Sequence, residues 1–421
     1  MSTVVLGVGG GIAAYKACYL VRRLAEAGHR VHVIPTEAAL QFVGRPTWEA
    51  LSGHPVHTTV FDDVPGVEHV RLGEQADLVI VAPATADLVS RIAAGAADDL
   101  LTATVLATRA PVLVAPAMHT AMWQNPATRD NVATLRRRGV VVKDPADGRL
   151  TGPDSGPGRL PEPDELAELA ALLLADPGVV GSLAAQDLTG RRVVISAGGT
   201  REALDPVRYL GNSSSGRMGT ALAMLAVTRG AEVTLVSAHL EVPVPSCLHQ
   251  IPVSSTEDLS EVMGTLAPSA DVIVMAVAAA DFAPVSSAQV KIKKHEGSDA
   301  VGAGTRIDLV QTPDVLAALA ASRRPGQVIV GFAAETAPDR AELLELAAAK
   351  LRRKACDLLV VNDVSAGKVF GKVDTDVTVV RQQGPGRRVQ GPKMMAAQAI
   401  LDEVRSLLAP ASGTPEPVPA S

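Results

Sequence analysis

The stretch TVVLGVGGGI, residues 3–12, decides the expected fold of this chain. A short apolar run rich in valine leads directly into three glycines, and a helical pattern then continues to Ala27 and ends at Gly28. The next apolar run, at 30–34, begins two residues later. A strand, a glycine turn, a helix and a second strand in this order predict a parallel sheet with helices on both faces.

The same alternation continues through the first half of the chain. Further strands are expected at 78–82, 111–115 and 140–142, with helices at 85–94, 127–138 and 162–175. Residues 144–164 interrupt the pattern with a run dense in glycine and proline, which we expect to form a long loop or a flap. Residues 177–190 show little periodicity and are expected to be a linker.

The alternation restarts at Arg191 and predicts a second domain. Strands are expected at 192–197, 232–236, 271–277, 328–333 and 357–361, a hairpin beginning at 375–381, and helices ending near 229, 354 and 408. The sequence therefore predicts an α/β protein with domains at 1–176 and 191–409. Residues 410–421, rich in proline, serine and alanine, are expected to be a disordered tail.

Composition limits the classes of function. The chain has 421 residues, 47% of them hydrophobic and 20% charged, so it can bury a sizeable core. Its net charge of −6 argues against a nucleic-acid-binding protein, which would normally carry a basic surplus. Three separated cysteines without a CxxC pair argue against a disulfide framework and a cysteine zinc site. With no signal peptide and no long apolar run, we expect a soluble cytoplasmic protein without a membrane segment.

Two glycine-rich turns are candidate anion sites. The first, GVGGGI at 7–12, lacks the third glycine of the dinucleotide fingerprint, and its N–H groups suit one phosphate, as in FMN, better than a pyrophosphate. The second combines GGT at 198–200 with NSSSG at 212–216 and is a candidate seat for a triphosphate. Two Ala-Pro-Ala turns, at 82–84 and 115–117, end predicted strands where open sheets bind ligands. Each of these segments also fits an ordinary loop.

Several side chains are candidates for chemistry, and each has a plainer interpretation. His69 and His119 are candidates for acid–base catalysis, although lone histidines are usually surface or hydrogen-bonded residues. Lys350 and Lys354 share one face of a predicted helix and suit a phosphate, although an exposed helix face is the commoner role. The run KIKK at 291–294 is either a cationic strand face or a solvated edge.

Eight short stretches, in this order along the chain, carry a resemblance to a known family. They are GGIAAYK at 10–16, APATA at 82–86, PAM at 116–118, GPGR at 156–159, DPVRY at 205–209, NSSSG at 212–216, KIKK at 291–294 and GFAAET at 331–336. On these motifs, residues 1–408 resemble the bifunctional phosphopantothenoylcysteine decarboxylase / phosphopantothenate–cysteine ligase family of coenzyme A synthesis. The resemblance implies an N-terminal flavodoxin-like parallel sheet and a C-terminal Rossmann-like sheet.

For the N-terminal half, the resemblance implies an FMN-dependent decarboxylase of phosphopantothenoylcysteine. FMN would supply the two-electron acceptor for oxidation of the cysteine thiol toward a thioaldehyde. The C=S group would accept the electrons left when CO2 departs, and return of the hydride to the product would leave no net redox change. His69 would be the base near the thiol, with His119 in the same catalytic region. Thr151, Asp154 and Arg159 would belong to the flap over the substrate. The residues implied at the FMN are Gly9, Gly10, Gly11, Ile12, Thr36, Ala82, Thr85, Ala117 and Met118.

Three departures from the family pattern fall in this half. His119 stands where asparagine is usual, Gly9 stands where serine is usual, and the flap lacks the cysteine that donates a late proton in many members. Thr151, Asp154 and Ser155 are candidates for that proton donor. Two alternatives therefore stay open: a ligase whose FMN-binding half is inactive, and a non-enzymatic regulatory subunit with the flavin fold.

For the C-terminal half, the resemblance implies a CTP-dependent ligase. CTP would activate the phosphopantothenate carboxylate as an acyl-cytidylate with release of pyrophosphate, and the amine of cysteine would displace CMP. Arg208, Asn212 and Lys291 would act at the reacting groups, with Mg²⁺ held chiefly by CTP phosphates and water. The residues implied at the nucleotide are Met275, Ala276, Val277, Asp281, Lys291, Thr312, Pro313, Asp314, Val315, Phe332, Lys350 and Lys354. The family also implies a homo-oligomer, a dodecamer built from trimeric and dimeric contacts.

Overall fold

The computed structural model describes residues 1–61, 66–150, 154–292, 306–363 and 374–408. The chain divides into two compact units. Unit 1 comprises Met1–Asp187 with Pro245–Cys247, and unit 2 comprises Leu188–Val244 with Leu248–Ser421. The tail expected at 410–421 lies outside the described residues.

Unit 1 is built on a five-stranded sheet in the order β2-β1-β3-β4-β5, in which all neighbours are parallel. The strands are β1 (Thr3–Val8), β2 (Arg30–Pro35), β3 (Leu78–Ala84), β4 (Val112–Pro116) and β5 (Val141–Val142). Every residue of β1 and β3 is buried, as expected for central strands covered on both faces. The parallel sheet predicted from the apolar runs is confirmed here.

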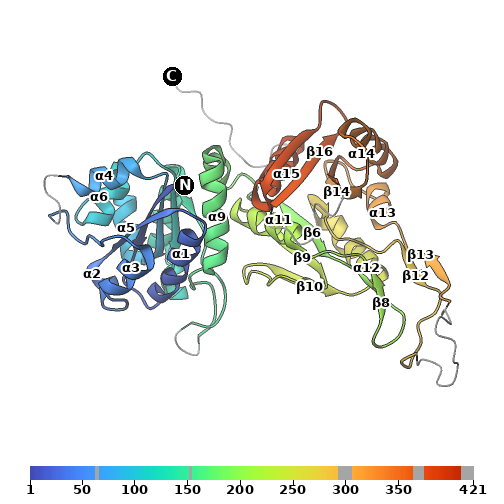
Figure 1. Ribbon diagram of the computed structural model, residues 1–421, viewed down its shortest axis with the longest axis horizontal. Helices are drawn as coiled ribbons and strands as arrows, with labels where there is room; N and C mark the ends of the chain where they lie inside the picture. The colour runs from blue at the N-terminus through green and yellow to red at the C-terminus, as the bar shows by residue number, and fades with distance from the viewer. Residues whose placement is uncertain (62–65, 151–153, 293–305, 364–373, 409–421) are drawn as a thin grey trace. The chain divides into compact units, whose positions relative to one another are not determined.

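Helices cover both faces of this sheet (Figure 1). Side chains of α4, α5, α6 and α8 join Val5, Val79 and Val81 in one buried cluster. Helix α1 packs against α3 and α9, and α1 and α9 also contact β3. The helices are α1 (Ala14–Glu26), α2 (Glu37–Leu40), α3 (Arg45–Ser52), α4 (Glu68–Gln75), α5 (Ala86–Ala94), α6 (Leu100–Ala107), α7 (Thr120–Trp123), α8 (Pro126–Arg137) and α9 (Pro163–Ala175).

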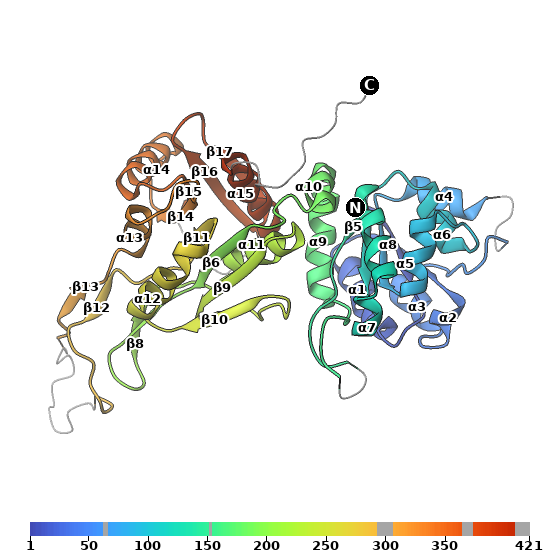
Figure 2. The ribbon, with the colours of Figure 1, turned by 180° about the vertical axis from the view of Figure 1, so that it is seen from behind.

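Residues 177–190 are not the irregular linker expected from the sequence. A 3-10 turn, η1 (Pro177–Val179), runs into α10 (Val180–Ala185), which packs against α8 and β5 (Figure 2). The segment is short and contains Gly178 and Gly181, so its sequence shows no clear helical periodicity. Among the described residues, no single helix is long and apolar enough to cross a membrane. A pair bent by 109°, Pro163–Ala175 with Pro177–Ala185, passes that test of length and composition together.

Unit 2 contains an eight-stranded sheet in the order β10-β9-β6-β11-β14-β15-β16-β17. Its first six strands are parallel, and β16 and β17 add an antiparallel hairpin, as the sequence predicted for 375–381. The strands are β6 (Arg192–Gly198), β9 (Glu232–Ala238), β10 (His249–Val253), β11 (Val272–Met275), β14 (Val328–Glu335), β15 (Leu358–Asp363), β16 (Asp374–Arg381) and β17 (Arg387–Pro392). Two small antiparallel hairpins complete the unit: β7 (Arg201–Ala203) with β8 (Tyr209–Gly211), and β12 (Phe282–Pro284) with β13 (Leu309–Gln311).

Helices also flank the sheet of unit 2. Helices α11 (Arg217–Thr228) and α15 (Lys393–Leu407) pack against each other. Helices α12 (Thr256–Leu266), α13 (Val315–Ala321) and α14 (Arg340–Lys354) contribute to a buried cluster with β11 and β14, and η2 (Ala267–Ser269) follows α12. The sequence pattern did not predict β10, α12 or α13. Strand β10 is mostly exposed at a sheet edge and therefore lacks a strong apolar signal.

Candidate functional site

A cavity of about 1230 Å³ lies in unit 1 at the carboxyl ends of the parallel strands. Open parallel sheets commonly bind ligands at this edge. Seven of the nine residues expected at FMN line it: Gly10, Gly11, Ile12, Thr36, Thr85, Ala117 and Met118. Other lining residues include Lys16, Arg91, Asp98, Asp99, His119, Met122, Arg149 and Arg159. Gly9 and Ala82 are not lining residues; Gly9 instead supports the turn by donating its N–H to the Pro83 carbonyl at 2.9 Å.

The glycine turn after β1 packs too tightly for larger residues at Gly9 and Gly10, and it leads into a helix that has no side-chain cap. A Cβ on Gly10 would lie 2.3 Å from the Ala38 Cβ, and a Cβ on Gly9 would lie 2.5 Å from the Pro83 carbonyl oxygen. Helix α1 follows with Ala13 at its N-cap and no side-chain cap. The N–H groups of Ala14 and Lys16 donate to the Gly11 and Ala13 carbonyls at 2.9 and 3.0 Å. The partial positive charge of the helix start still suits an anion in the cavity.

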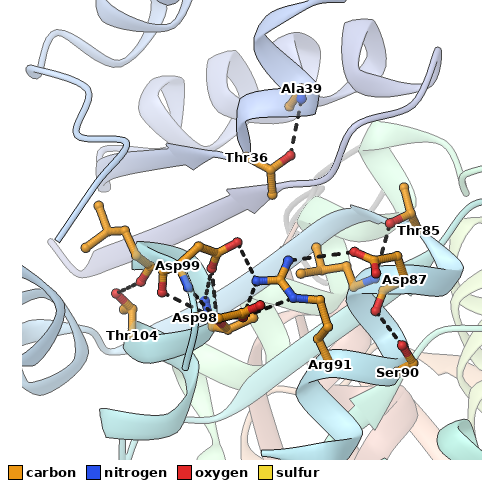
Figure 3. A network of polar contacts seen from close by, with 12 residues as sticks. Thr36, Ala39, Thr85, Asp87, Ser90, Arg91, Asp98, Asp99 and Thr104 are labelled. Carbon is orange, nitrogen blue, oxygen red and sulfur yellow. Dashed lines mark hydrogen bonds and ion pairs between the residues drawn. The ribbon is translucent and has the colours of Figure 1, made fainter. Parts of the chain in front are cut away.

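Two threonines begin further helices at the cavity wall. The Thr36 hydroxyl accepts the N–H of Ala39, and the Thr85 hydroxyl accepts the N–H of Leu88, each at 3.2 Å (Figure 3). Both side chains are thereby fixed as N-caps of α2 and α5. Each hydroxyl keeps its own hydrogen for donation to a ligand oxygen.

An arginine surrounded by three aspartates forms part of the same wall. The Arg91 guanidinium donates to Asp98, lies 2.8 Å from Asp99 Oδ2 and lies 3.7 Å from Asp87 Oδ2 (Figure 3). The hydrogen bonds from Arg91 lower the pKa of Asp98. Asp99 also caps α6 through a capping box with Thr102. Arg91 thus holds α5 to the start of α6, a role that sequence reasoning missed although the spacing of Asp99 and Thr102 is a capping signal.

The predicted flap and His119 meet at the cavity. His119 Nε2 lies 3.3 Å from Asp154 Oδ2, and its Nδ1 accepts the N–H of Ala121 at 3.3 Å. Met118 donates its N–H to the Gly158 carbonyl at 3.0 Å, which fastens the base of the flap. Arg159 lines the cavity, Asp154 is not a lining residue, and Thr151 lies outside the described residues.

His69 does not line the cavity, although it was expected to act as the base near the thiol. It lies in the first turn of α4, where its Nδ1 is buried without a hydrogen-bond partner in the described part of the chain. Glu68 beside it is 1% exposed in its side chain and pairs with Arg71 at 2.6 Å, while His57 lies 3.6 Å away. The Nδ1 of His57 is likewise buried without a partner among the described residues, and neither imidazole lines the cavity.

In unit 2, hydrogen bonds bring several of the expected nucleotide residues together after β11. The Asn212 amide donates to the Ala279 carbonyl at 2.8 Å. The N–H of Thr312 donates to the backbone carbonyl of Asp281 at 3.1 Å, and its hydroxyl donates to the backbone carbonyl of Ala280 at 2.6 Å. Helix α11 starts nearby in sequence at the positive-φ cap Gly216, again without a side-chain cap. The loop that follows Asn212 thus leads to a second helix start without a side-chain cap. Met275 ends β11, Ala276 and Val277 follow it, and Phe332 lies in β14.

The expected cations of unit 2 differ in their surroundings. Lys350 pairs with Glu335 at 2.7 Å, and Lys354 pairs with Asp314, the N-cap of α13. Burial raises the pKa of Asp314, but hydrogen bonds from Lys354 and Ala317 outweigh it, so this pKa lies below its usual value. Pro313 and Val315 flank Asp314 in the chain. Both lysines are therefore paired with carboxylates, so they are neither unpaired cations ready to bind phosphate nor simply exposed to solvent.

Lys291 is exposed and does not lie in a strand, contrary to the strand interpretation of 291–294. Lys293 and Lys294 lie outside the described residues. Arg208 pairs with Asp205 at 2.9 Å. Across the described ranges, no group of three or more His, Cys, Asp or Glu side chains is arranged to hold a metal.

Comparisons with known proteins match both units. The family described as "Flavoprotein" matches residues 1–174, and the "DNA/pantothenate metabolism flavoprotein C-terminal domain" matches residues 188–408. The coenzyme A biosynthesis bifunctional protein CoaBC of Mycobacterium tuberculosis is 54% identical over 413 residues, covering 96% of this chain and 97% of that protein. The CoaBC of Vibrio cholerae is 43% identical over 403 residues, covering 94% and 96%.

A solved structure also resembles part of the chain. The crystal structure of the C-terminal domain of a coenzyme A biosynthesis bifunctional protein CoaBC is 32% identical, with a TM-score of 0.42, and covers 53% of this chain and 97% of its own. The sequence matches run along almost the whole of both chains. On this identity and coverage, the protein belongs to the family of coenzyme A biosynthesis bifunctional proteins.

Proposed function

We propose that this chain performs two consecutive steps of coenzyme A biosynthesis. Unit 2 would join phosphopantothenate to cysteine with CTP through an acyl-cytidylate, and unit 1 would decarboxylate phosphopantothenoylcysteine to phosphopantetheine with FMN. The observation that carries this proposal is the pairing, on one chain of a bifunctional family, of the cavity in unit 1 with the cation-bearing loops of unit 2.

The cavity in unit 1 suits FMN. Its volume of about 1230 Å³, the start of α1 without a side-chain cap and the hydroxyls of Thr36 and Thr85 fit a flavin with one phosphate. Bound there, FMN would supply a reversible two-electron acceptor. Loss of CO2 would then not have to leave a carbanion that nothing stabilises. The N–H groups around Gly11 would hold the phosphate, His119 with Asp154 would hold or move a proton, and Arg159 would attract anionic groups of the substrate.

In unit 2 the chain would stabilise negative charge on phosphate and carboxylate oxygens. Arg208 and Lys291 would face the reacting acyl-phosphate, and Asn212 would hold the loop after β11 against it. Lys350 and Lys354 would exchange their carboxylate partners for nucleotide phosphates. Mg²⁺ would rest chiefly on CTP phosphates and water, in keeping with its preference for phosphate oxygens and retained water ligands.

Product analysis tests the proposal. Purified protein with phosphopantothenate, cysteine, CTP and Mg²⁺ is expected to form phosphopantetheine, CMP, pyrophosphate and CO2, as followed by mass spectrometry. Accumulation of phosphopantothenoylcysteine without phosphopantetheine would favour a ligase with an inactive FMN-binding half. Absence of any turnover, including CO2 release from supplied phosphopantothenoylcysteine, would leave the regulatory-subunit alternative.

We also propose a homo-oligomer, a dodecamer with trimeric and dimeric contacts. Large apolar side chains near the cavity are exposed: Ile12, Tyr15 and Phe61 are 60%, 52% and 79% exposed. Their exposure supports contact with a neighbouring subunit that would cover them. In unit 2, Val285 and Val290 are similarly exposed, at 65% and 76%. Light scattering is expected to give twelve times the chain mass of 43.4 kDa, and a monomer in solution would contradict the assembly without touching the chemistry.

Replacement of Gly10 by alanine is expected to yield protein without bound flavin. The new methyl group would lie 2.3 Å from the Ala38 Cβ, and overpacking of this kind typically costs about 1–3 kcal/mol and shifts backbone. Because the shift falls on the cavity wall, we expect the FMN absorbance and CO2 release to be lost while ligation persists.

The matched control is Gly181→Ala in α10 of the same unit, where the added methyl meets no heavy atom within 4 Å. An alanine there favours the helix by about 1 kcal/mol and should leave the flavin in place. A fully yellow Gly10→Ala protein with wild-type CO2 release would contradict the assignment of this turn.

A further inference from the structure

The carboxylate of Asp205 joins two segments of unit 2 that are far apart in the sequence. Its side chain is 0% exposed, although it belongs to the turn between β7 and β8. Oδ1 accepts the N–H groups of Val207 and Arg208, both at 2.8 Å. Oδ2 accepts the N–H of Ile292 at 3.1 Å and lies 2.9 Å from Nη2 of Arg208. One oxygen thus shapes the turn, and the other reaches a distant segment.

The contacts of Oδ2 fix the neighbourhood of Lys291. Ile292, the next residue, is 87 positions from Asp205. The Arg208 guanidinium also donates to the Ile292 carbonyl. The guanidinium of Arg208 and the backbone of Lys291 are therefore held at one spacing by a buried anion and its partners.

Asp205 is held in its ionised form at this position. Burial raises its pKa, but the N–H groups of Val207, Ile292 and Arg208, with the charge of Arg208, outweigh burial and bring the pKa below its usual value. An ionised carboxylate is acceptor-only and serves all of these donors at once. An asparagine keeps one acceptor oxygen but turns an NH2 group toward either the turn or the Ile292 segment.

We infer that Asp205 is a positioning residue for ligation, which sets Arg208 and Lys291 against the reacting acyl-phosphate by tethering the two segments that bear them. The inference rests on the proposed function of unit 2. Asp205 itself is buried and does not touch substrate. Its role is to keep the Arg208 guanidinium and the backbone of Lys291 at one spacing before the substrate arrives, so that little reorganisation is needed when charge develops on the phosphate oxygens.

The test compares Asp205→Asn with the matched control Asp308→Asn in the full-length protein. Asp308 also pairs with an arginine, at 2.9 Å, but its side chain is 69% exposed. Hydrogen exchange at the Ile292 amide reports the tether without reference to activity. Steady-state ligation reports kcat and the KM for CTP separately, and CO2 release from supplied phosphopantothenoylcysteine reports the state of unit 1.

For Asp205→Asn we expect faster exchange at Ile292 and a kcat for ligation about a hundredfold lower, since misplacement of about 1 Å can have this effect. The KM for CTP should change by less than about threefold, CO2 release should stay at wild type, and Asp308→Asn should resemble wild type in all readouts. A merely structural role would instead lower the amount of folded protein and leave the kcat of the folded fraction unchanged.

Ile292→Pro provides a second variant should Asp205→Asn fail to fold, because proline removes the tethered N–H and leaves Asp205 intact. It is expected to show the same loss of kcat with little change in KM. Wild-type ligation in a variant whose Ile292 segment has been released would overturn the inference. Wild-type protein that lacks ligation would instead refute the proposed function, while exchange at Ile292 would still report the tether.

Discussion

The Lys291→Gln protein is expected to release CO2 from supplied phosphopantothenoylcysteine at the wild-type rate and to ligate about a hundredfold to a thousandfold more slowly. Lys291 is exposed, next to the segment that Asp205 holds beside Arg208. Glutamine keeps much of the length and the polarity but cannot offset charge on a phosphate. Mass spectrometry of timed reactions, with phosphopantothenoylcysteine and pyrophosphate followed together, measures this loss.

Arg306→Gln is the control for Lys291→Gln. Its side chain is 90% exposed in the same unit and pairs only with the exposed Asp308 among the contacts described, so its removal deletes a surface charge without touching the tethered segment. We expect wild-type ligation from this control. Equal losses in both variants would mean that the general field of unit 2, rather than the position of Lys291, accounts for the effect.

The second large effect is expected from His69→Asn, which should lose CO2 release by about a hundredfold to ten-thousandfold and retain ligation. Asparagine resembles histidine in size but does not accept a proton near neutral pH. The Nδ1 of His69 is buried without a hydrogen-bond partner among the described residues, a state shared by His29 and His57, and it could therefore accept a proton. The readout is ¹³CO2 from labelled substrate, with phosphopantothenoylcysteine formation measured in parallel.

Because His69 does not line the cavity in unit 1, the outcome also decides between two proton acceptors. Unchanged CO2 release in His69→Asn would assign His69 a structural role in α4. The acid–base pair at the cavity would then be His119 with Asp154, whose Nε2 and Oδ2 atoms lie 3.3 Å apart. His249→Asn, at an exposed edge of unit 2, serves as the control and should leave both reactions intact. Loss of both reactions in His69→Asn would contradict the division of labour between the units.

The sequence predicted the sheets well because their signal is local. Central strands such as β1 and β3 are buried on both faces and read as unbroken apolar runs, and the glycine turn follows one of them directly. Several helices that the sequence pattern did not predict lack such a signal. Helix α10 is short and contains Gly181, and α12 is marked by a capping box at Ser255 and Asp258 rather than by a long apolar pattern.

The candidate sites were harder to predict where they depend on long-range contacts. Motif positions such as Gly10 and Met118 do line the cavity. By contrast, Arg91 gains its role from Asp98 and Asp99 across a loop, and Asp205 gains its role from Ile292, 87 residues away. Neither pairing has a periodic pattern or a fixed spacing, so only the folded chain brings these charges together.

The sulfur content of the cavity wall governs how unit 1 should respond to oxidants and alkylating reagents. The described lining residues include Met118 and Met122 but no cysteine, while Cys18 lies elsewhere on α1 with a pKa raised by burial. Iodoacetamide reacts with thiolates, so it has no target on this part of the wall. Peroxide damage there would take the form of methionine sulfoxide, which reductases repair, rather than an irreversibly over-oxidised thiol.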